Sequence, residues 1–147
     1  MITVIEQLSV FLENQPGRLA DLCRVLGDAG VNMRALMVAD TTEFGVVRII
    51  CDHPLAGKEA LEGAGFGVSV TGVLAVEIPD QPGGLADVLE ALGRERINVE
   101  YAYCFVEPGN HGAVDVLKVD DDRGREVLEA QGYRVLKPAD LYRPDTP

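Results

Sequence analysis

Hydrophobic and polar residues alternate over two short stretches that lie 66 residues apart in the chain. Every second residue is aliphatic from 8 to 12, and the same pattern returns from 74 to 78. A period of two is typical of a β-strand with one buried face. Each stretch is followed by a Pro-Gly pair and then by apolar residues at the spacing i, i+3, i+4, i+7, which predicts a helix packed on a sheet. The apolar stripes are Leu19, Leu22, Cys23 and Leu26 in the first case, and Leu85, Val88, Leu89 and Leu92 in the second.

A tandem duplication explains this recurrence. Residues 14–21 read NQPGRLAD, and residues 80–87 read DQPGGLAD. Of the twenty positions that begin with this motif, nine are identical to the residue 66 places later, where average composition would give roughly one or two. The offset grows to 67 later in the chain, so that Gly45 aligns with Gly112. The chain therefore holds two copies of one unit.

The hydrophobic pattern, taken from both copies, predicts the remaining elements. They are second strands at 31–39 and 97–106, third strands at 45–51 and 112–119, second helices at 55–64 and 123–130, fourth strands at 66–70 and 133–136, and turns at 40–43 and 107–110. Each copy is thus β-α-β-β-α-β, the order of the ferredoxin-like unit, in which an antiparallel sheet carries both helices on one face. We expect an α+β fold of two tandem units at 1–70 and 71–138, followed by a Pro-rich tail at 139–147 that frays.

The charge of the chain limits the partners that it can have. Acidic residues number 24 and basic residues 13, so the net charge is −11 with neutral His. Phosphate contacts depend on Lys and Arg, which do not cluster here. The third strand also lacks the stacking aromatic residues of an RNA-binding sheet. We therefore expect no nucleic-acid partner.

The sequence carries no sign of targeting to a membrane. The first ten residues lack a basic stretch, and no apolar run approaches the ~18 residues that a membrane-spanning helix needs. The three cysteines are odd in number and widely spaced, as in a reducing compartment. We expect a cytoplasmic protein without a membrane partner.

Few residues are suited to catalysis or metal binding. Ser9 and Ser69 lie within predicted strands, and His53 and His111 lie beside predicted turns with no nucleophile placed next to them by any motif. The acidic run at 120–122 is explained more simply by the start of a helix than by a metal site. No glycine-rich segment has the spacing of a phosphate-binding loop. We expect no catalytic residue, no metal and no cofactor.

The repeated loop at 14–17 and 80–83 is the strongest functional candidate, and two interpretations of it stay open. In the first, the loop only starts a helix, with Asn or Asp as the cap, Pro in the first turn and Gly in a tight turn. In the second, the residues after Pro present free backbone N–H groups at the positive end of a helix, which is a site for a small carboxylate. The residues of this second interpretation are Gly17, Arg18, Leu19, Gly83, Gly84 and Leu85.

Both copies resemble the ACT domain, a small-molecule sensing module of amino-acid metabolism. The resemblance covers about residues 3–137, and it rests on the repeated loop, the leucine-rich helix and the Val31-Asn32 and Ile97-Asn98 pairs. It implies a stand-alone tandem ACT protein that binds a free amino acid between the loop of one domain and the second strand of its neighbour. It also implies that domains pair side by side, so we expect a homodimer. The implied ligand-binding residues are Asn14, Pro16, Gly17, Arg18, Leu19, Asn32, Asp80, Gln81, Gly83, Gly84, Leu85 and Asn98.

The two copies differ at two positions of the loop. Asn14 and Arg18 in the first copy correspond to Asp80 and Gly84 in the second. A carboxylate at position 80 would repel a ligand carboxylate unless it binds the ligand ammonium or caps the helix. We therefore do not expect the two sites to be equivalent, and the first is better suited to an anion.

These features favour an amino-acid-binding regulatory protein without catalytic activity. One alternative is a regulatory subunit that acts in trans on a biosynthetic enzyme, such as an acetolactate-synthase-like enzyme. Co-purification with a catalytic partner would distinguish it. Another alternative is a small enzyme, which would need a titratable pair that converges on one pocket, and the sequence contains no motif for such a pair.

Overall fold

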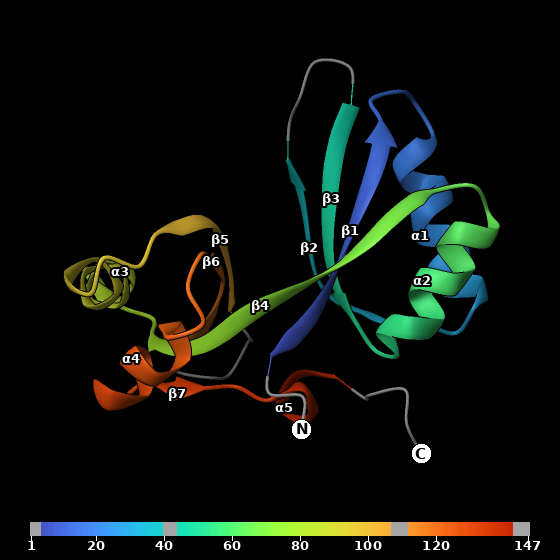
Figure 1. Ribbon diagram of the computed structural model, residues 1–147. Coiled ribbons are helices and arrows are strands. Elements are labelled where there is room, and N and C mark those ends of the chain that lie inside the picture. Colours follow the sequence, from blue (N-terminus) through green and yellow to red (C-terminus); the bar gives the residue numbers. More distant parts are fainter. Residues whose placement is uncertain (1–3, 40–43, 107–111, 143–147) are drawn as a thin grey trace. The chain divides into compact units, whose positions relative to one another are not determined.

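The computed structural model describes residues 4–39, 44–106 and 112–142 (Figure 1). Contacts divide the chain into two compact units. The first unit contains Glu6–Thr71 together with the segment that begins at Pro138, and the second contains Gly72–Lys137 together with the segment that ends at Ile5. The two sequence copies therefore fold as separate units, and each receives one terminal segment of the chain.

The first unit is an antiparallel sheet covered by two helices on one face, as Figure 1 shows on the side of the labels α1 and α2. Its elements are β1 (Ile5–Glu13), α1 (Arg18–Asp28), β2 (Met33–Ala39), β3 (Phe44–Cys51), α2 (Pro54–Gly63) and the first part of β4 (Gly67–Pro79). The strand order is β2-β3-β1-β4, so the first and last strands of the unit lie side by side. This is the arrangement of the ferredoxin-like unit.

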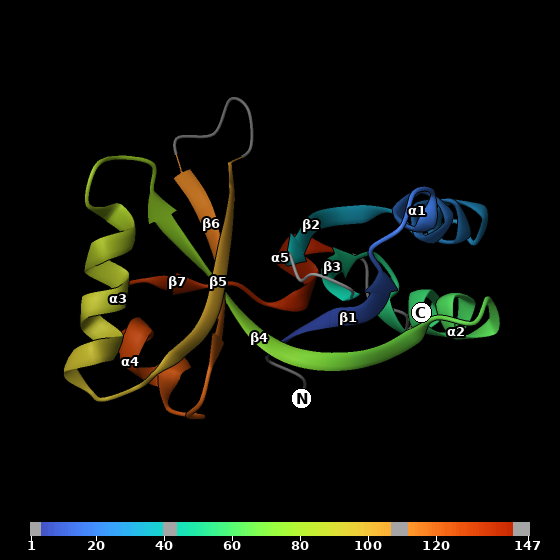
Figure 2. The ribbon, with the colours of Figure 1, turned by 90° about the horizontal axis from the view of Figure 1, so that it is seen from above.

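The second unit repeats this plan, and Figure 2 shows its helices together on one side of its strands. Its elements are the second part of β4, α3 (Gly84–Arg94), β5 (Val99–Val106), β6 (Gly112–Val119), α4 (Gly124–Ala130) and β7 (Arg134–Val135). The strand order is β5-β6-β4, and β7 pairs with the other side of β4. The predicted α+β fold of two tandem ferredoxin-like units is confirmed.

The helices pack on the sheets through the stripes that the sequence predicts. In α1, Leu22 and Leu26 are fully buried against Leu8 and Val10 of β1. In α3, Val88 and Leu92 are buried in the same way in a second, separate core. Each fully buried aliphatic side chain contributes about 1.5–3 kcal/mol relative to an exposed one. Each unit therefore has a hydrophobic core of its own.

The strand at the junction of the copies and the alignment of the third strands both differ from the predictions. A single strand, β4, runs from Gly67 to Pro79, where the sequence predicts two strands with a break between them. Leu12 pairs with Gly45 in the first unit, while Ile78 pairs with Ala113 in the second. The offset in the third strand is therefore 68 and not 67, and Gly45 corresponds to Ala113. The predicted turns at 40–43 and 107–110 lie outside the described residues.

The chain from Pro138 to Tyr142 is ordered, so the prediction of a frayed tail is wrong for this part. Pro138–Leu141 forms a short helix, α5, and both Leu141 and Tyr142 are buried. The backbone N–H of Glu6 donates to the Tyr142 hydroxyl at 3.2 Å, and Arg34 Nε donates to the Leu141 carbonyl at 2.9 Å. These contacts hold α5 on the first unit. Residues 143–147 lie outside the described part of the chain.

Candidate functional site

The two loops after β1 and β4 enter their helices through a glycine in a left-handed conformation. Gly17 has φ of 89° and Gly83 has φ of 85°, and each is the N-cap of its helix. Neither helix start has a hydrogen bond from a capping side chain. Asn14 and Asp80 are therefore not the N-caps that the first interpretation of the loop predicts. Glycine is favoured at both positions because a Cβ makes this conformation costly.

The first turn of each helix leaves backbone donors without an acceptor in the helix. The N–H of Arg18 donates to the Gln15 carbonyl, and the N–H of Asp21 donates to the Gly17 carbonyl. The intervening N–H groups, of Leu19 and Ala20, belong to the first turn, where helix geometry provides no acceptor. Since no side chain caps this end, these donors are available to an anion.

A pocket of about 300 Å³ adjoins this end of α1. Asn14 and Leu19, two of the predicted ligand-binding residues, line it together with Gln15. The opposite wall comes from Val38 and Ala39 of the edge strand β2. The remaining lining residues are Leu12, Glu13 and Gly45. The pocket is thus lined by the loop and by strands of the same unit, with both apolar and polar residues.

Arg18 is not among the residues that line this pocket. Its guanidinium lies within 3.3 Å of both Glu13 and Asp21, and 4.5 Å from the centre of the Phe66 ring. The side chain therefore braces the loop against β1 and the segment before β4. Its charge is shared with two carboxylates, so it is not directed at the pocket as a free cation.

The second loop follows the same path with a tighter helix start. The N–H of Gly84 donates to the Gln81 carbonyl, as Arg18 does to Gln15 in the first loop. Gly84 is buried, and a Cβ there would clash with the carbonyl oxygen of Pro79. Arg18 occupies the same position of the first loop, so the two loops differ locally, as their sequences predict. Asp80, Gln81 and Leu85 are exposed.

Asn32 and Asn98 lie at the other end of their units, away from the loops of the same copy. Each follows a helix of 11 residues, which is about 16 Å long. The Asn32 carbonyl accepts from the Asp52 N–H at 2.8 Å, and the Asn98 carbonyl accepts from the Asp120 N–H at 3.2 Å. Both residues thus join the second strand to the end of the third. The expectation that they face the loop of a neighbouring copy stays a prediction.

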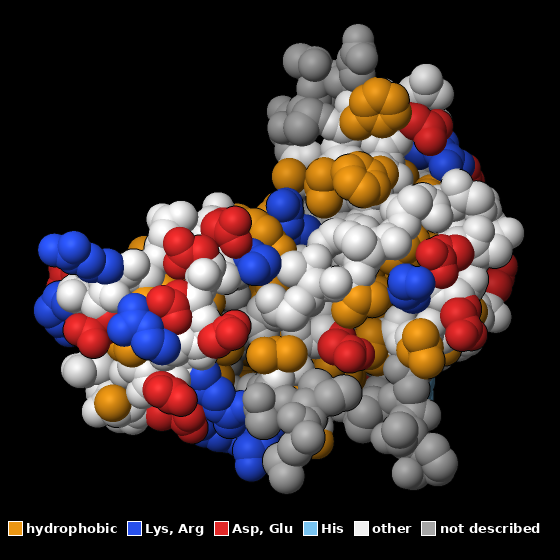
Figure 3. Space-filling model, in the orientation of Figure 1, with side chains coloured by type: hydrophobic (Ala, Val, Ile, Leu, Met, Phe, Trp, Pro, Cys, Tyr) orange, Lys and Arg blue, Asp and Glu red, His pale blue; other side chains and the backbone are white. Residues whose placement is uncertain are grey.

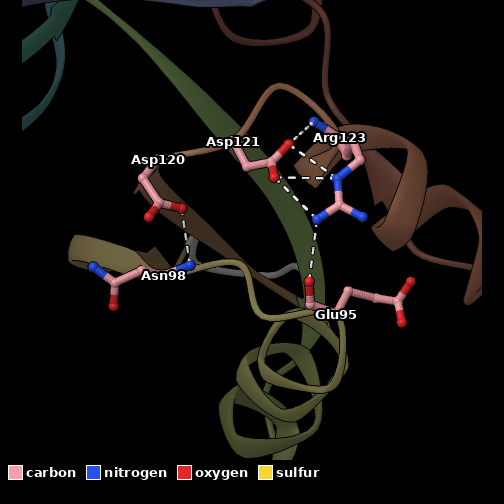
Figure 4. A network of polar contacts seen from close by, with 5 residues as sticks. All are labelled: Glu95, Asn98, Asp120, Asp121 and Arg123. Carbon is pink, nitrogen blue, oxygen red and sulfur yellow. Dashed lines mark hydrogen bonds and ion pairs between the residues drawn. The ribbon is translucent and has the colours of Figure 1, made fainter.

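The acidic run at 120–122 closes the same end of the second unit, as Figure 4 shows. Asp120 Oδ1 accepts from the Asn98 N–H at 3.0 Å, and Asp121 Oδ1 accepts from the Arg123 N–H at 2.8 Å. Hydrogen bonds from the Arg123 side chain and backbone lower the pKa of Asp121. Arg123 also donates to the Glu95 carbonyl at 3.1 Å. These carboxylates organise the start of α4, which supports the structural interpretation of the run.

One notable pair of residues was not predicted from the sequence. Asp115 of β6 is fully buried, and its Oδ1 accepts from the Cys104 thiol at 3.0 Å. Burial raises the pKa of Asp115, although the hydrogen bond from Cys104 opposes this. Burial, the hydrogen bond to Asp115 and the charge of Asp115 together raise the pKa of Cys104 to about 12. The sequence does place one acid, Asp115, within an apolar strand. With the predicted offset of 67 between the copies, however, Asp115 aligns with Arg48 and not with a core residue of the first copy.

Comparison with known families decides what this arrangement is. The family model described as the ACT domain pair matches residues 2–143. The chain is an ACT domain pair. The resemblance seen in the loops is thereby confirmed over nearly the whole chain. ACT domains are regulatory modules that generally bind small-molecule effectors.

Solved structures place this ACT pair among close and distant relatives. A crystal structure of a protein from Bacteroides thetaiotaomicron is 36% identical, covers 95% of this chain and 96% of its own, and superposes with a TM-score of 0.89. The regulatory subunit of aspartate kinase from Thermus thermophilus, in its ligand-free form, is 17% identical over 88% of this chain and 92% of its own, with a TM-score of 0.63. The corresponding subunit from Thermus flavus is 16% identical over 88% and 91%, with a TM-score of 0.65. At these identities the two aspartate kinase subunits show a shared fold. No curated protein matches the chain.

The described residues of the ACT pair contain neither a cluster of side chains for a metal ion nor a helix that could span a membrane. No group of three or more His, Cys, Asp or Glu side chains has an arrangement that could hold a metal ion. No helix in residues 4–39, 44–106 and 112–142 is both long and apolar enough to cross a membrane.

Proposed function

We propose that this ACT pair is a cytoplasmic regulatory protein that binds a free amino acid in the pocket of the first unit and has no catalytic activity of its own. The pocket beside α1 is the observation that carries this proposal. Its volume of about 300 Å³ is at the lower end of the range for small-molecule sites. It therefore suits a ligand of the size of an amino acid. Cys23, Cys51 and Cys104 are thiols and not disulfides, which supports a reducing compartment.

The pocket offers complementary groups to each part of an amino acid. The carboxylate would accept hydrogen bonds from the N–H groups of Leu19 and Ala20 at the uncapped start of α1. The ammonium would donate to the side-chain carbonyl of Asn14. The apolar lining, from Leu12 and Val38, favours an aliphatic side chain over a charged one. We propose that a neutral amino acid is the effector of the first unit.

Substitution at Leu19 tests this site directly. Leu19 is 38% exposed, so Leu19→Arg can keep the fold while its longer side chain fills the pocket. Leu85, which is 36% exposed, is the equivalent position of the second unit, and Leu85→Arg is the matched control. With the neutral amino acid that gives the largest signal in titration calorimetry, Leu19→Arg weakens binding at least tenfold and Leu85→Arg does not. Unchanged affinity in both variants would exclude this pocket as the site.

A second candidate function is that of a regulatory subunit acting on a separate biosynthetic enzyme. An exposed apolar patch on the face of the first sheet opposite α1 and α2 favours it. Phe11 is 60% exposed and Phe44 is 57% exposed, and the register places both on the face opposite Val10 and Leu12. Figure 3 shows hydrophobic side chains gathered over this part of β1 and β3. Co-purification with a catalytic partner, lost in Phe11→Ser, would support this function. A protein that sediments alone would oppose it, as would a homodimer held by the same face.

A further inference from the structure

The sheet register identifies the residues of the second unit that correspond to the pocket of the first. In the first unit, Val10 of β1 pairs with Val47, and Val47 pairs with Val38 of the edge strand. In the second unit, the same three positions are Val76, Asp115 and Cys104. Val38 lines the first pocket and Val47 lies beside it in the sheet, and in the second unit these two valines are replaced by a thiol and a carboxyl. The substitution lies on the helix-covered face of the sheet, since Val76 belongs to the second core.

Asp115 lacks the hydrogen bonds that a buried carboxyl needs. Its side chain is fully buried, and Oδ1 has one donor, the Cys104 thiol at 3.0 Å. Oδ2 is also buried and has no hydrogen-bond partner in the described part of the chain. A thiol is a weak donor, and a buried carboxylate is costly unless it is paired and fully bonded. Such an orphaned oxygen in a native core requires an explanation.

A ligand can reach this oxygen by moving one small side chain. Cys104 lies on β5, which is at the edge of the sheet, and it is exposed. Because Cys104 pairs with Asp115 across the two strands, rotation of the Cys104 side chain would uncover the Asp115 carboxyl from the edge of the sheet. The residues that correspond to the lining of the first pocket include one acid, Asp80, and no Lys or Arg, and Asp115 pairs with one of them, Cys104. The corresponding residues are Ile78, Pro79, Asp80, Gln81, Leu85, Cys104, Phe105 and Ala113.

We propose that the second unit binds the ammonium group of a cationic ligand, a diamino acid or a diamine, at Asp115, with the Cys104 thiol turned aside. The ammonium supplies the donors that Oδ2 lacks, and Asp80 at the rim adds to the negative charge of the site. The inference rests on the proposed function of the ACT pair as an effector-binding module, and it assigns different ligand classes to the two units.

L-Lysine and L-norleucine are the matched probes, because they share a backbone and a four-carbon chain and differ in the terminal ammonium. Titration calorimetry on the full chain should give lysine at least a tenfold tighter affinity than norleucine for the second unit, measured in the Leu19→Arg background to remove the first pocket. Asp115→Asn and Asp115→Val should abolish this preference. Glu90→Gln, which removes an exposed acid from α3, should keep it.

The variants separate binding from folding. Val47 shows that valine is accommodated at this position of the fold, so Asp115→Val should melt at a temperature no lower than the wild type, because it removes a buried group with an unmet hydrogen bond. Lysine affinity that is unchanged in both Asp115 variants would overturn the inference, as would the absence of lysine binding to the wild type. Suppose that a neutral amino acid binds, that Leu19→Arg abolishes this binding, and that lysine and norleucine then bind with equal affinity. The proposed function would stand and this inference would fall. If lysine binds and both Asp115 variants abolish its binding, while no neutral amino acid binds, this inference would stand and the proposed neutral effector of the first unit would fall.

Discussion

Gly17 and Gly83 are the residues on which the two loops depend most. Both have a positive φ, and a Cβ at either position would meet no atom within 4 Å. The space beyond each glycine is therefore open, and the requirement for glycine comes from the backbone conformation and not from crowding. An open space at an uncapped helix start is also what an incoming carboxylate needs.

Gly17→Ala should destabilise the protein by about 1 kcal/mol or more, because alanine is strained at this φ. Gly27→Ala, within α1 and also without a close neighbour for its Cβ, should stabilise it by roughly 0.5–1 kcal/mol. Urea unfolding of the two variants measures both effects. Equal changes of the same sign would show that Gly17 is not held in the left-handed conformation.

The Cys104 thiol should react slowly with alkylating reagents although the residue is exposed. With a pKa of about 12, it is almost entirely protonated at pH 8, and the thiolate is the reactive form. Alkylation by iodoacetamide, followed by peptide mass spectrometry, should be roughly 100-fold or more slower in the native protein than in urea. Asp115→Asn should recover part of the rate, because the charge is removed while the burial remains. A native rate equal to the rate in urea would contradict this assignment.

The raised pKa of Cys104 also determines in which direction the stability of the protein changes with pH. The unfolded chain releases the thiol proton near the ordinary value of 9.0, whereas the folded chain keeps it until about 12. The free energy of unfolding should therefore fall as the pH rises from about 9 to 12. The Cys104→Ala variant should lack this contribution.

At the scale of single residues, the sequence predicted the two glycine loops but not the buried Asp115. The loops could be found because local chemistry specifies them: the Pro-Gly pair fixes the turn, and the duplication repeats it. Asp115 could not be found because its burial depends on the register between β4 and β6. One residue of error in the alignment moves a side chain to the other face of a sheet. The partners of Arg18 could not be predicted for a similar reason, since they include Phe66, far away in the sequence.

Among the elements, α1 and α3 show how one plan accommodates two helix starts. Their apolar stripes and lengths agree, yet α1 begins with Arg18 and α3 with Gly84. A Cβ at Gly84 would clash with the Pro79 carbonyl, so β4 approaches its helix more closely than β1 does. The elements themselves were predicted almost entirely from periodicity, because burial of one face dictates both the strand and the helix patterns.

Gly84→Ala should therefore destabilise the second unit by about 1–3 kcal/mol, the usual cost of overpacking. Gly93→Ala, on the same helix with no neighbour near its Cβ, is the control and should be neutral or stabilising. Thermal unfolding followed by circular dichroism measures the difference. A Gly84→Ala variant as stable as the control would mean that the start of α3 can shift without cost.

Across the whole molecule, the links between the two copies were the least predictable feature. The single strand β4 runs from Gly67 to Pro79, through a segment that the duplication marks as a boundary. The C-terminal segment returns to the first unit through Leu141 and Tyr142, and its composition alone gives no indication of this packing. Both features depend on contacts between residues that are distant in sequence, which a local pattern does not record.

The most direct measurement of the central claim is a thermal-shift screen of the full chain with each of the twenty amino acids. A ligand at 100 times its dissociation constant adds about 2.7 kcal/mol to the free energy of unfolding, which raises the melting temperature of a chain of this size by at least about 5 °C. At least one neutral amino acid should give this shift, and its carboxamide, which lacks the anion for the start of α1, should give much less. If none of the twenty amino acids shifts the melting temperature at millimolar concentration, the ACT pair is not an amino-acid sensor.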